Sequence, residues 1–352
     1  MSGSVEPGFE PVRDVFRDLL VAGQGTGSAV AAWYDGRWVV DLWGGWADAG
    51  RTRRWTRDTI VMPYSVSKPY AAVCALVLVA RGRLDLDASA RRYWPQLRVD
   101  ATVRQILSHS AGLVTLYRPA PTGAFFDWDD LCRRIAEQEP AWPPGEGVGE
   151  SSLLYGHLVG ELVRRVDGRS LGTFLREEVS GPFGLDFCVG VSDVDLGRVA
   201  DLTGAVPGGA GGPLHEAALA NPPGATDLAV VNSRAFRRAE VPAINGHGTA
   251  RAVAGLYVAL THGALLPTDL LTQLRSVQAS GFDAVVGDHA RWGLGVGIDD
   301  DGWGMGGLGG NLGWFSERGQ YAFAFVTGDL GGFERATALE NTVRAVLGRP
   351  AL

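Results

Sequence analysis

The feature that most constrains the fold is the placement of strand-like patterns at both ends of the chain, with helix-like patterns between them. Apolar stretches between turn residues predict strands at 27–36, 37–45, 291–300, 311–320 and 321–330. The first two are joined around Asp35-Gly36, which is a hairpin signal. Helical periodicity predicts helices near 11–22 and 334–347 and through most of 65–262. We therefore expect an α/β (α+β) fold in which both chain ends build one antiparallel sheet around a mostly helical insertion.

The composition is typical of a folded globular chain with a sizeable core. The 352 residues are 46% hydrophobic and 20% charged. We expect a single domain over 1–352, with a sheet subdomain at about 1–64 and 265–352 and a helical subdomain at about 65–264. A glycine-rich stretch at 204–213 predicts a loop inside the helical part.

Charge and hydropathy exclude several classes of partner. The net charge is −7 and no run of basic residues forms a stripe, which argues against nucleic acid. The longest apolar run, Ala71 to Ala80, is too short to span a bilayer and predicts a buried helix, so no membrane partner is expected. No secretion signal is expected from the N-terminal pattern, and three distant cysteines predict reduced thiols in a cytoplasmic protein: Cys74, Cys132 and Cys188. Scattered histidines predict no metal site, no cofactor is expected, and the oligomeric state stays open.

The stretch "SVSK", residues 65–68, contains the only lysine in a chain rich in arginine. Lysine can lose its proton when it is buried, whereas arginine cannot. Ser65 lies three residues before Lys68 at the start of an apolar helical pattern, so the two side chains share a face. Helix N-termini also offer free backbone N–H groups. The spacing therefore predicts a nucleophile, a proton acceptor and oxyanion donors in one place.

Several further stretches accompany this motif: "TVRQILSHSAGL" at 102–113, "WPPG" at 142–145, the segment 157–186 and "NGHGTARAVAGLY" at 245–257. With "SVSK", they resemble the serine β-lactamase-like superfamily, which includes class C β-lactamases and penicillin-binding proteins, and within it the esterase and transacylase branch. The resemblance covers nearly the whole chain. It implies a β-lactamase/transpeptidase-like fold, with Ser65 as the acyl-accepting nucleophile and Lys68 as its proton acceptor.

The family's second motif begins with a Tyr that assists proton transfer. Counting from the Pro-Gly pair at 144–145 places Glu150 at that position, so the Tyr is missing. Glu150 is expected to ion-pair with Lys68 or to act as a base, and a carboxylate there would favour the protonated amine. Alternatives are a hydroxyl from Ser151 or Ser152, an inward Tyr155, or loss of activity by drift.

The family's third motif, Lys-Thr-Gly in β-lactamases, aligns with Met305-Gly306-Gly307 in a strand predicted at 302–313. No cation stands there, which argues against penicillin-type substrates. The backbone N–H of Leu308 is then the expected second oxyanion donor beside that of Ser65. The glycines are interpreted as letting an edge strand approach substrate, and not as a dinucleotide motif. The expected substrate-binding positions are Tyr155, His247, Met305, Gly306 and Gly307.

Two histidines are interpreted as structural or as part of the pocket lining. His247, in "NGHGTAR", is predicted to lie in a turn before a helix that Thr249 caps. His109, in "SHSAGL", is expected to hold its loop in place.

The residues and the resemblance together predict a serine acyl-enzyme acting on a small ester or amide, with water as the default acyl acceptor. Such a protein is a carboxylesterase-like hydrolase. One alternative is a transacylase that passes the acyl group to an amine or alcohol in specialised-metabolite biosynthesis. A second alternative is a non-catalytic binding protein on the same fold.

Overall fold

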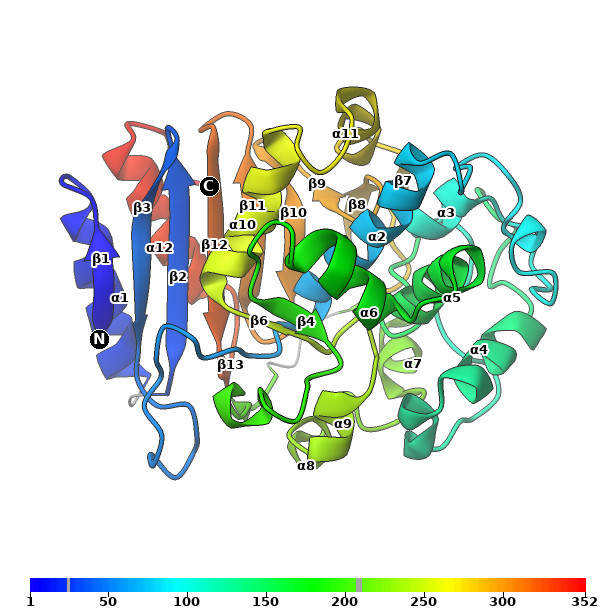
Figure 1. The fold of residues 1–352 in the computed structure, drawn as a ribbon, viewed down its shortest axis with the longest axis horizontal. Coiled ribbons are helices and arrows are strands. Elements are labelled where there is room, and N and C mark those ends of the chain that lie inside the picture. The colour runs from blue at the N-terminus through cyan, green and yellow to red at the C-terminus, as the bar shows by residue number, and fades with distance from the viewer. Residues whose placement is uncertain (24–25, 207–210) are drawn as a thin grey trace.

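The computed structural model describes residues 1–23, 26–206 and 211–352. Within them, nine strands form one antiparallel sheet in the order β1-β3-β2-β12-β11-β10-β9-β8-β7 (Figure 1). These strands are β1 Ser2–Val5, β2 Ser28–Tyr34, β3 Arg37–Gly44, β7 Ala279–Phe282, β8 His289–Trp292, β9 Gly297–Ile298, β10 Gly302–Gly307, β11 Asn311–Ser316 and β12 Tyr321–Thr327. The N-terminal and C-terminal parts of the chain meet where β2 pairs with β12, for example Ala31 with Ala324.

The central strands are apolar on both faces because helices cover both sides of the sheet. Along β2, Ala29 and Ala31 join the core under the helical part, while Val30 and Ala32 join a second core on the opposite face. Alternating side chains therefore feed two separate layers. On the face under the helical part, small residues let the covering helix pack close to the sheet, because a Cβ on Gly313 would lie 2.6 Å from Val253 of that helix.

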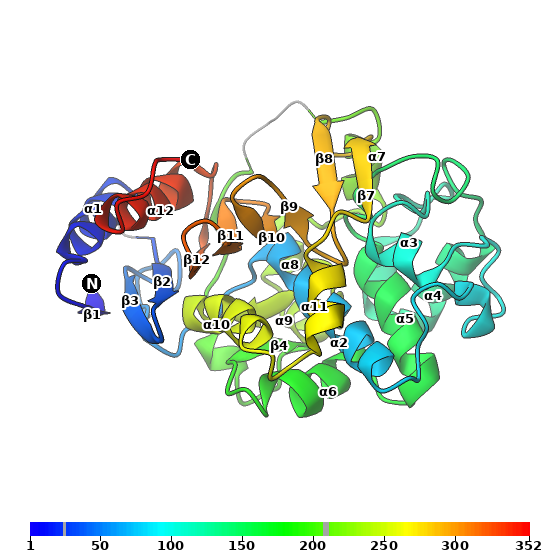
Figure 2. The ribbon, with the colours of Figure 1, turned by 90° about the horizontal axis from the view of Figure 1, so that it is seen from above.

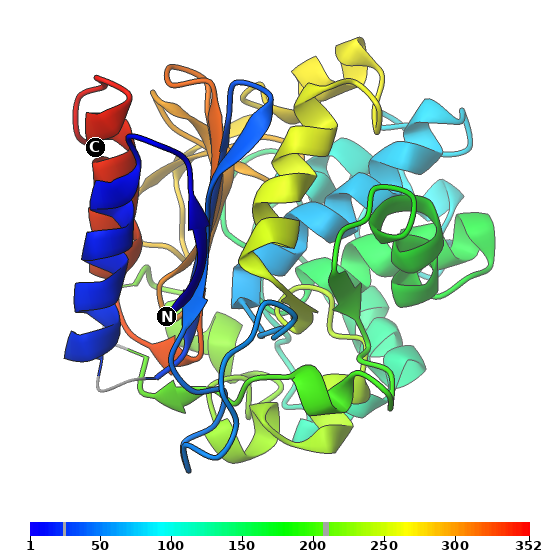
Figure 3. The ribbon, with the colours of Figure 1, turned by 60° about the vertical axis from the view of Figure 1, so that its left-hand side comes forward.

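Figures 2 and 3 show the layers: α1 and α12 lie together on one face of the sheet, and α10 lies across the other with the remaining helices beyond it. The helices are α1 Glu10–Ala22, α2 Lys68–Ala80, α3 Val103–Leu107, α4 Trp128–Glu137, α5 Tyr155–Asp167, α6 Leu171–Leu175, α7 His215–Ala220, α8 Leu228–Val231, α9 Arg234–Arg238, α10 Ala250–Thr261, α11 Thr268–Leu274 and α12 Glu334–Val346.

Helix α2 runs through the middle of the helical part. Its residues from Lys68 to Leu78 are all buried, as expected for a helix that is apolar on every side. Pro69 sits in its first turn, where a missing N–H is tolerated. A 3-10 turn, η1 Tyr64–Ser67, leads directly into it.

The predicted architecture is confirmed: both chain ends build one antiparallel sheet, and a mostly helical segment is inserted between them. The predicted hairpin is β2 and β3, and the predicted terminal helices are α1 and α12. Of the glycine-rich stretch 204–213, residues 207–210 lie outside the described residues.

Three details of the prediction are wrong. The strand expected at 302–313 is two strands, because the chain turns at 308–310 between β10 and β11. Strand β10 is not an edge strand, since β9 pairs with its other side. His247 lies in a short strand, β6 Gly246–Gly248, which pairs with β4 Phe187–Val189, instead of in a turn. Thr249 does cap α10, and its hydroxyl accepts the N–H of Ala252.

In the three described segments, no helix is both long enough and apolar enough to cross a membrane. The same segments hold no group of three or more His, Cys, Asp or Glu residues placed to bind a metal ion.

A buried polar cluster joins α12 to the sheet. Glu340 is 1% exposed, and its Oε1 accepts the hydroxyl of Tyr321 at 2.7 Å. Arg344 donates to Tyr321 at 3.2 Å and to Asp301 at 2.8 Å. Burial raises the pKa of Glu340 to about 7, although the Tyr321 hydrogen bond opposes the shift. Below about pH 7, the folded protein therefore favours the protonated form of Glu340.

This cluster predicts a pH-dependent stability. The folded protein keeps the Glu340 proton from about pH 4.5 to about pH 7 while the unfolded chain loses it, so the free energy of unfolding should fall as pH rises through that window. The full effect is on the order of 3 kcal/mol. Glu340→Gln, which cannot ionise, should remove this part of the slope in denaturant unfolding measured from pH 4 to 8. Glu334→Gln, at the exposed start of the same helix, is the matched control. An unchanged slope in Glu340→Gln would contradict the assignment.

Candidate active site

The turn that presents Ser65 is strained. Tyr64 has a φ of 50°, in the left-handed region that bulky residues rarely adopt. Its ring is 2% exposed, and its hydroxyl donates to the carbonyl of Ala225 at 3.2 Å. Such a backbone typically costs about 1–3 kcal/mol and persists where packing enforces it. The buried Tyr64 ring holds the turn, and Ser65 follows with its side chain only partly buried.

Lys68 is the first residue of α2, and its side chain has no exposed surface. Its Nζ lies 2.7 Å from Ser65 Oγ, 2.9 Å from Glu150 Oε1 and 3.3 Å from the carbonyl oxygen of Ala243. These three oxygens match the three N–H bonds of an ammonium group. The structure therefore brings Ser65 and Lys68 together as a hydrogen-bonded pair and adds a carboxylate to them.

Glu150 comes from the loop that leads into α5, and its side chain is 14% exposed. Its Oε1 contacts Lys68 Nζ and also lies 3.4 Å from Ser65 Oγ, which can donate to it. Of the residues considered for the missing Tyr, Glu150 is the one that the structure brings to the pair. The hydroxyl of Ser152 lies instead 3.5 Å from the Glu150 carbonyl. No hydrogen bond in the described part of the chain joins the Ser151 hydroxyl to either residue of the pair.

Two opposing effects act on the Lys68 amine. Burial lowers its pKa, because the charged form loses its hydration. The charge of Glu150 and its hydrogen bond raise the pKa again, but burial is the larger effect and the net shift is downward. A lowered pKa brings the neutral amine, which can accept a proton, within reach at moderate pH.

Strand β10 packs against the turn that carries Ser65. A Cβ on Gly307 would lie 2.0 Å from the carbonyl oxygen of Pro63, so only glycine allows this approach. Leu308 follows, and its N–H has no backbone acceptor among the described residues. The N–H of Ser65 lies in the first turn of η1, where helical N–H groups lack an acceptor in their own helix. Both groups are free to donate to an oxyanion.

Not all of the expected substrate-binding residues face the site. Tyr155 is fully buried, and its hydroxyl donates to the carbonyl of Leu107 at 3.2 Å, so its expected contact with substrate is wrong. His247 is 1% exposed and no described contact joins it to Ser65. Met305 is 5% exposed and packs with Val148 and Trp292.

Gly306, the residue after Met305, faces the side of β10 opposite to the Ser65 turn. A Cβ on Gly306 would lie 2.9 Å from the ring of Phe333, which precedes α12. Gly306 therefore faces away from the turn that Gly307 touches, because neighbouring residues of a strand alternate between its faces.

His109 and Asp283 hold the loop that carries Glu150. The Nδ1 of His109 accepts the N–H of Ser151 at 3.1 Å, and burial lowers the pKa of His109 to about 3, assisted by the charge of Lys68. The neutral ring can therefore accept, as expected for a loop-holding residue. Asp283, which accepts the N–H of Glu150 at 3.1 Å, was missed because it follows Glu150 by 133 residues and belongs to no motif.

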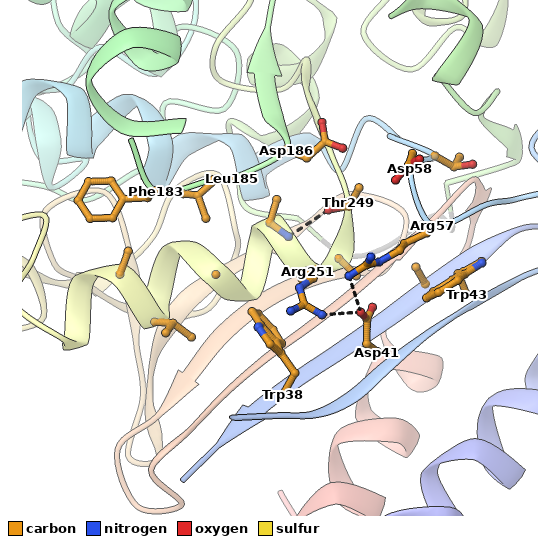
Figure 4. Close-up of a pocket in the computed structure, with 18 of the residues that line it drawn as sticks. Trp38, Asp41, Trp43, Arg57, Asp58, Phe183, Leu185, Asp186, Thr249 and Arg251 are labelled. Atoms are coloured by element: carbon orange, nitrogen blue, oxygen red, sulfur yellow. Dashed lines mark hydrogen bonds and ion pairs between the residues drawn. The ribbon is translucent and has the colours of Figure 1, made fainter. Parts of the chain in front are cut away.

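A separate hollow of about 610 Å³ lies between β3, the start of α10 and the loops at 57–59 and 183–186 (Figure 4). Asp41 pairs there with Arg251 at 2.6 Å and with Arg57 at 3.8 Å. The Arg251 guanidinium also lies 4.4 Å from the centroid of the Trp38 ring. These contacts tie α10 to β3. None of the residues that contact Ser65 Oγ is part of this lining.

Comparison with known proteins gives consistent matches. The family model described as Beta-lactamase matches residues 12–347. The esterase/beta-lactamase LipL of Mycobacterium tuberculosis (strain ATCC 25618 / H37Rv) is 32% identical over 364 residues, covering 92% of this chain and 82% of that protein. A crystal structure of a family VIII carboxylesterase superposes with a TM-score of 0.90 at 31% identity, covering 98% of this chain and 99% of that one. A penicillin-binding protein homolog from Caulobacter crescentus superposes with a TM-score of 0.89 at 32% identity and the same coverage.

If the Lys68 amine accepts the Ser65 proton, Lys68→Arg should be as damaging as Lys68→Ala, because arginine keeps the charge and cannot accept a proton. We expect both variants to lose about 10²- to 10⁴-fold in the rate of ester cleavage. Burst kinetics with a p-nitrophenyl ester measure the acylation step, and thermal unfolding checks that each variant folds. Substantial activity in the arginine variant would exclude Lys68 as the acceptor.

Glu150→Gln should have two effects that can be separated. The loss of its charge removes the influence that raises the pKa of Lys68, so the rising limb of kcat/KM against pH should shift to lower pH. Loss of a proton-transfer partner should also lower the rate by about 10- to 10⁴-fold. Glu146→Gln, the same change at an exposed position of the loop, is the control and should leave both the rate and the limb unchanged. A parental profile in Glu150→Gln would show that Glu150 takes no part.

Proposed function

The chain belongs to the β-lactamase superfamily, in its serine esterase branch, and from this premise we propose that it is a carboxylesterase-like hydrolase which forms an ester between Ser65 and the acyl part of a small ester or amide. The resemblance predicted from "SVSK" and its companion motifs is confirmed, as is the β-lactamase/transpeptidase-like fold. The carboxylesterase at 31% identity and the esterase/beta-lactamase at 32% identity support an ester as the substrate class.

The observation that carries this proposal is the contact of three functional groups around the buried Lys68 amine. Ser65 Oγ, Lys68 Nζ and Glu150 Oε1 lie within 3.4 Å of one another in each pair. A hydroxyl becomes a useful nucleophile when a neighbouring group can take its proton as it attacks. Lys68 is the closer of the two acceptors, at 2.7 Å.

Acylation begins with a proton transfer inside the Lys68–Glu150 pair. An ammonium group has no lone pair, so the proton first moves from Lys68 Nζ to Glu150 Oε1 across the 2.9 Å contact. Burial assists this step, because it penalises the charged form of Lys68. The neutral amine then takes the Ser65 proton while Oγ bonds to the substrate carbonyl carbon. The N–H groups of Ser65 and Leu308 stabilise the oxyanion that forms.

The leaving group departs with the proton that Lys68 has just accepted. The bond between the carbonyl carbon and the alkoxide oxygen breaks, an alcohol is released, and Lys68 is again neutral beside the protonated Glu150. Water then attacks the acyl-enzyme and gives its proton to Lys68, which returns it to Ser65 Oγ as the acid product leaves. The return of the Glu150 proton to Lys68 restores the starting state.

The third-motif strand favours an uncharged acyl group over a β-lactam. Met305-Gly306-Gly307 offers no cation to a substrate carboxylate. A drug of the penicillin class would bring its carboxylate to this strand without gaining a partner there, which costs binding energy.

A second candidate function is transacylation, in which a bound amine or alcohol replaces water as the acceptor. The contacts of Lys68 with Ser65 and Glu150 support it as they support hydrolysis, because the neutral amine can take a proton from a bound alcohol or amine as well as from water. The chemistry before the acceptor step is the same for both functions.

A fluorophosphonate probe and a p-nitrophenyl butyrate assay test the proposal. The parent should be labelled once and should hydrolyse the ester with an initial burst, whereas Ser65→Ala should show neither, because the bond to Oγ cannot form. The parent should leave benzylpenicillin essentially intact over the same period. Intact-protein mass spectrometry counts the labels, and analysis of the released products with and without added amines identifies the acceptor.

Ser67→Ala is the matched control, since Ser67 is a buried serine of the same turn whose hydroxyl accepts the N–H of Gly246 instead of facing the site. It should keep the labelling. Labelling that survives in Ser65→Ala would show that another nucleophile reacts and would exclude Ser65, whereas an unlabelled and inactive parent would favour a non-catalytic binding protein. Efficient penicillin hydrolysis would overturn the substrate assignment.

A further inference from the structure

Asp283 is a fully buried carboxylate outside every motif of the chain. It directly follows β7, and its relative exposure is 0%. Its Oδ1 accepts the N–H groups of Glu150 at 3.1 Å, Val285 at 2.9 Å and Val286 at 2.9 Å. Its Oδ2 accepts the indole N–H of Trp292 at 2.9 Å. A buried carboxyl group requires such donors, and here four N–H groups meet its two oxygens.

The backbone of the Glu150 loop is fixed on both sides of Glu150. The carbonyl of Val148 accepts the N–H of Ala284 at 3.0 Å, and the N–H of Gly149 donates to the carbonyl of His109 at 3.0 Å. Ser151 donates to the His109 ring at 3.1 Å. The hydrogen bond to Asp283 is the one that the backbone N–H of Glu150 itself donates. It therefore acts on the residue whose carboxylate must lie within 2.9 Å of Lys68.

We propose that Asp283 is a positioning residue for the acyl-transfer site, which holds the backbone of Glu150 so that its carboxylate stays against Lys68. The proposal rests on the proposed function, in which Glu150 exchanges a proton with Lys68. Asp283 follows β7, the edge strand that lies beyond β10, β9 and β8 in the sheet, and it has no described contact with Ser65. A displacement of about 1 Å in a reacting group can cost about 10²-fold in rate, so a hydrogen bond to the backbone is enough to matter.

Asp283 also connects the proton relay to the buried apolar cluster of Val148, Trp292 and Met305. Trp292, which donates to Oδ2, packs against Met305 and Val148, and its ring centroid lies 4.4 Å from that of His109. The titratable side chains whose described contacts reach this corner are Lys68, Glu150, His109 and Tyr155, with His215 on the far side of Val285. A change at Asp283 therefore reaches Lys68 through Glu150, and not through a new charge in contact with the amine.

Asp283→Asn is the principal test, because asparagine keeps the size but replaces one oxygen by an N–H donor. In one orientation the amide oxygen still faces the three backbone N–H groups but accepts them more weakly than a carboxylate, and in the flipped orientation the amide N–H donor meets them instead, so the hold on Glu150 is loosened in both. We expect kcat for a p-nitrophenyl ester to fall about 10- to 100-fold with little change in KM. The rising limb of kcat/KM should shift to lower pH, as in Glu150→Gln, because the carboxylate that favours the Lys68 ammonium is no longer held beside it.

Trp292→Phe is the matched control. It removes the donor to Oδ2 and leaves the hydrogen bond to Glu150, so it should lower the thermal unfolding temperature without moving the pH limb. If Asp283 were merely structural, both variants would lose stability and both would keep the parent's rising limb of kcat/KM against pH. That result would overturn the proposal. Should Asp283→Asn fail to fold, Asp283→Glu keeps the charge and displaces the carboxylate. The rising limb of kcat/KM should shift to lower pH in Asp283→Glu as well, and an unshifted limb would also overturn the proposal.

A double-mutant cycle separates this proposal from the proposed function. If Asp283 acts through Glu150, adding Asp283→Asn to Glu150→Gln should lower kcat by less than twofold further, which is a strongly non-additive result. Additive losses would overturn the positioning role. If Glu150→Gln alone has the parental rate and limb, the proposed proton relay fails instead. An effect of Glu150→Gln together with a parental Asp283→Asn rejects only the inference about Asp283.

Discussion

The rest of the site depends on the burial of one amine. Lys68 has no exposed side-chain surface, and a cation in such a place is tolerated only when oxygens replace its hydration shell. The three oxygens that do so belong to separate parts of the chain: Ser65 on the η1 turn, Glu150 before α5 and Ala243 before β6. The fold must bring these segments to one point, and the requirement explains why so much of the molecule converges there.

The scaffold meets this requirement through close packing around α2. The helix is apolar on every side, so the sheet and the other helices can surround it and hold Lys68 at its buried start. Strand β10 reaches the nucleophile turn because Gly307 has no side chain, and an interior strand paired on both sides gives the contact little freedom. Tyr64 completes the turn in a left-handed conformation that its buried ring enforces. Rigid packing thus replaces the flexibility that a loop-borne nucleophile would have.

Buried and exposed polar contacts contribute unequally here. Many arginines form ion pairs at the surface, such as Arg17 with Asp14, where both side chains are more than half exposed. Such pairs are worth about 0–1 kcal/mol and are screened by salt. A buried carboxylate such as Asp283 leaves several unsatisfied donors if it is lost, each costing about 1–3 kcal/mol. The polar groups that shape the site are therefore the few buried ones, and the numerous surface charges keep only a secondary role.

The sequence by itself determined the features that depend on residues close together in the chain and on the pattern of apolar residues along it. The spacing of Ser65 and Lys68 fixed their contact because residues three apart share a helical face, and the strand patterns at the two chain ends predicted the sheet. The motif count placed Glu150 at the missing Tyr, where its carboxylate does meet Lys68. Only the tertiary structure decided that Tyr155 points into the core, that β10 is interior and that Asp283 holds Glu150 across 133 residues. Periodicity reports which face a residue occupies, whereas the partner it meets there depends on how distant segments pack.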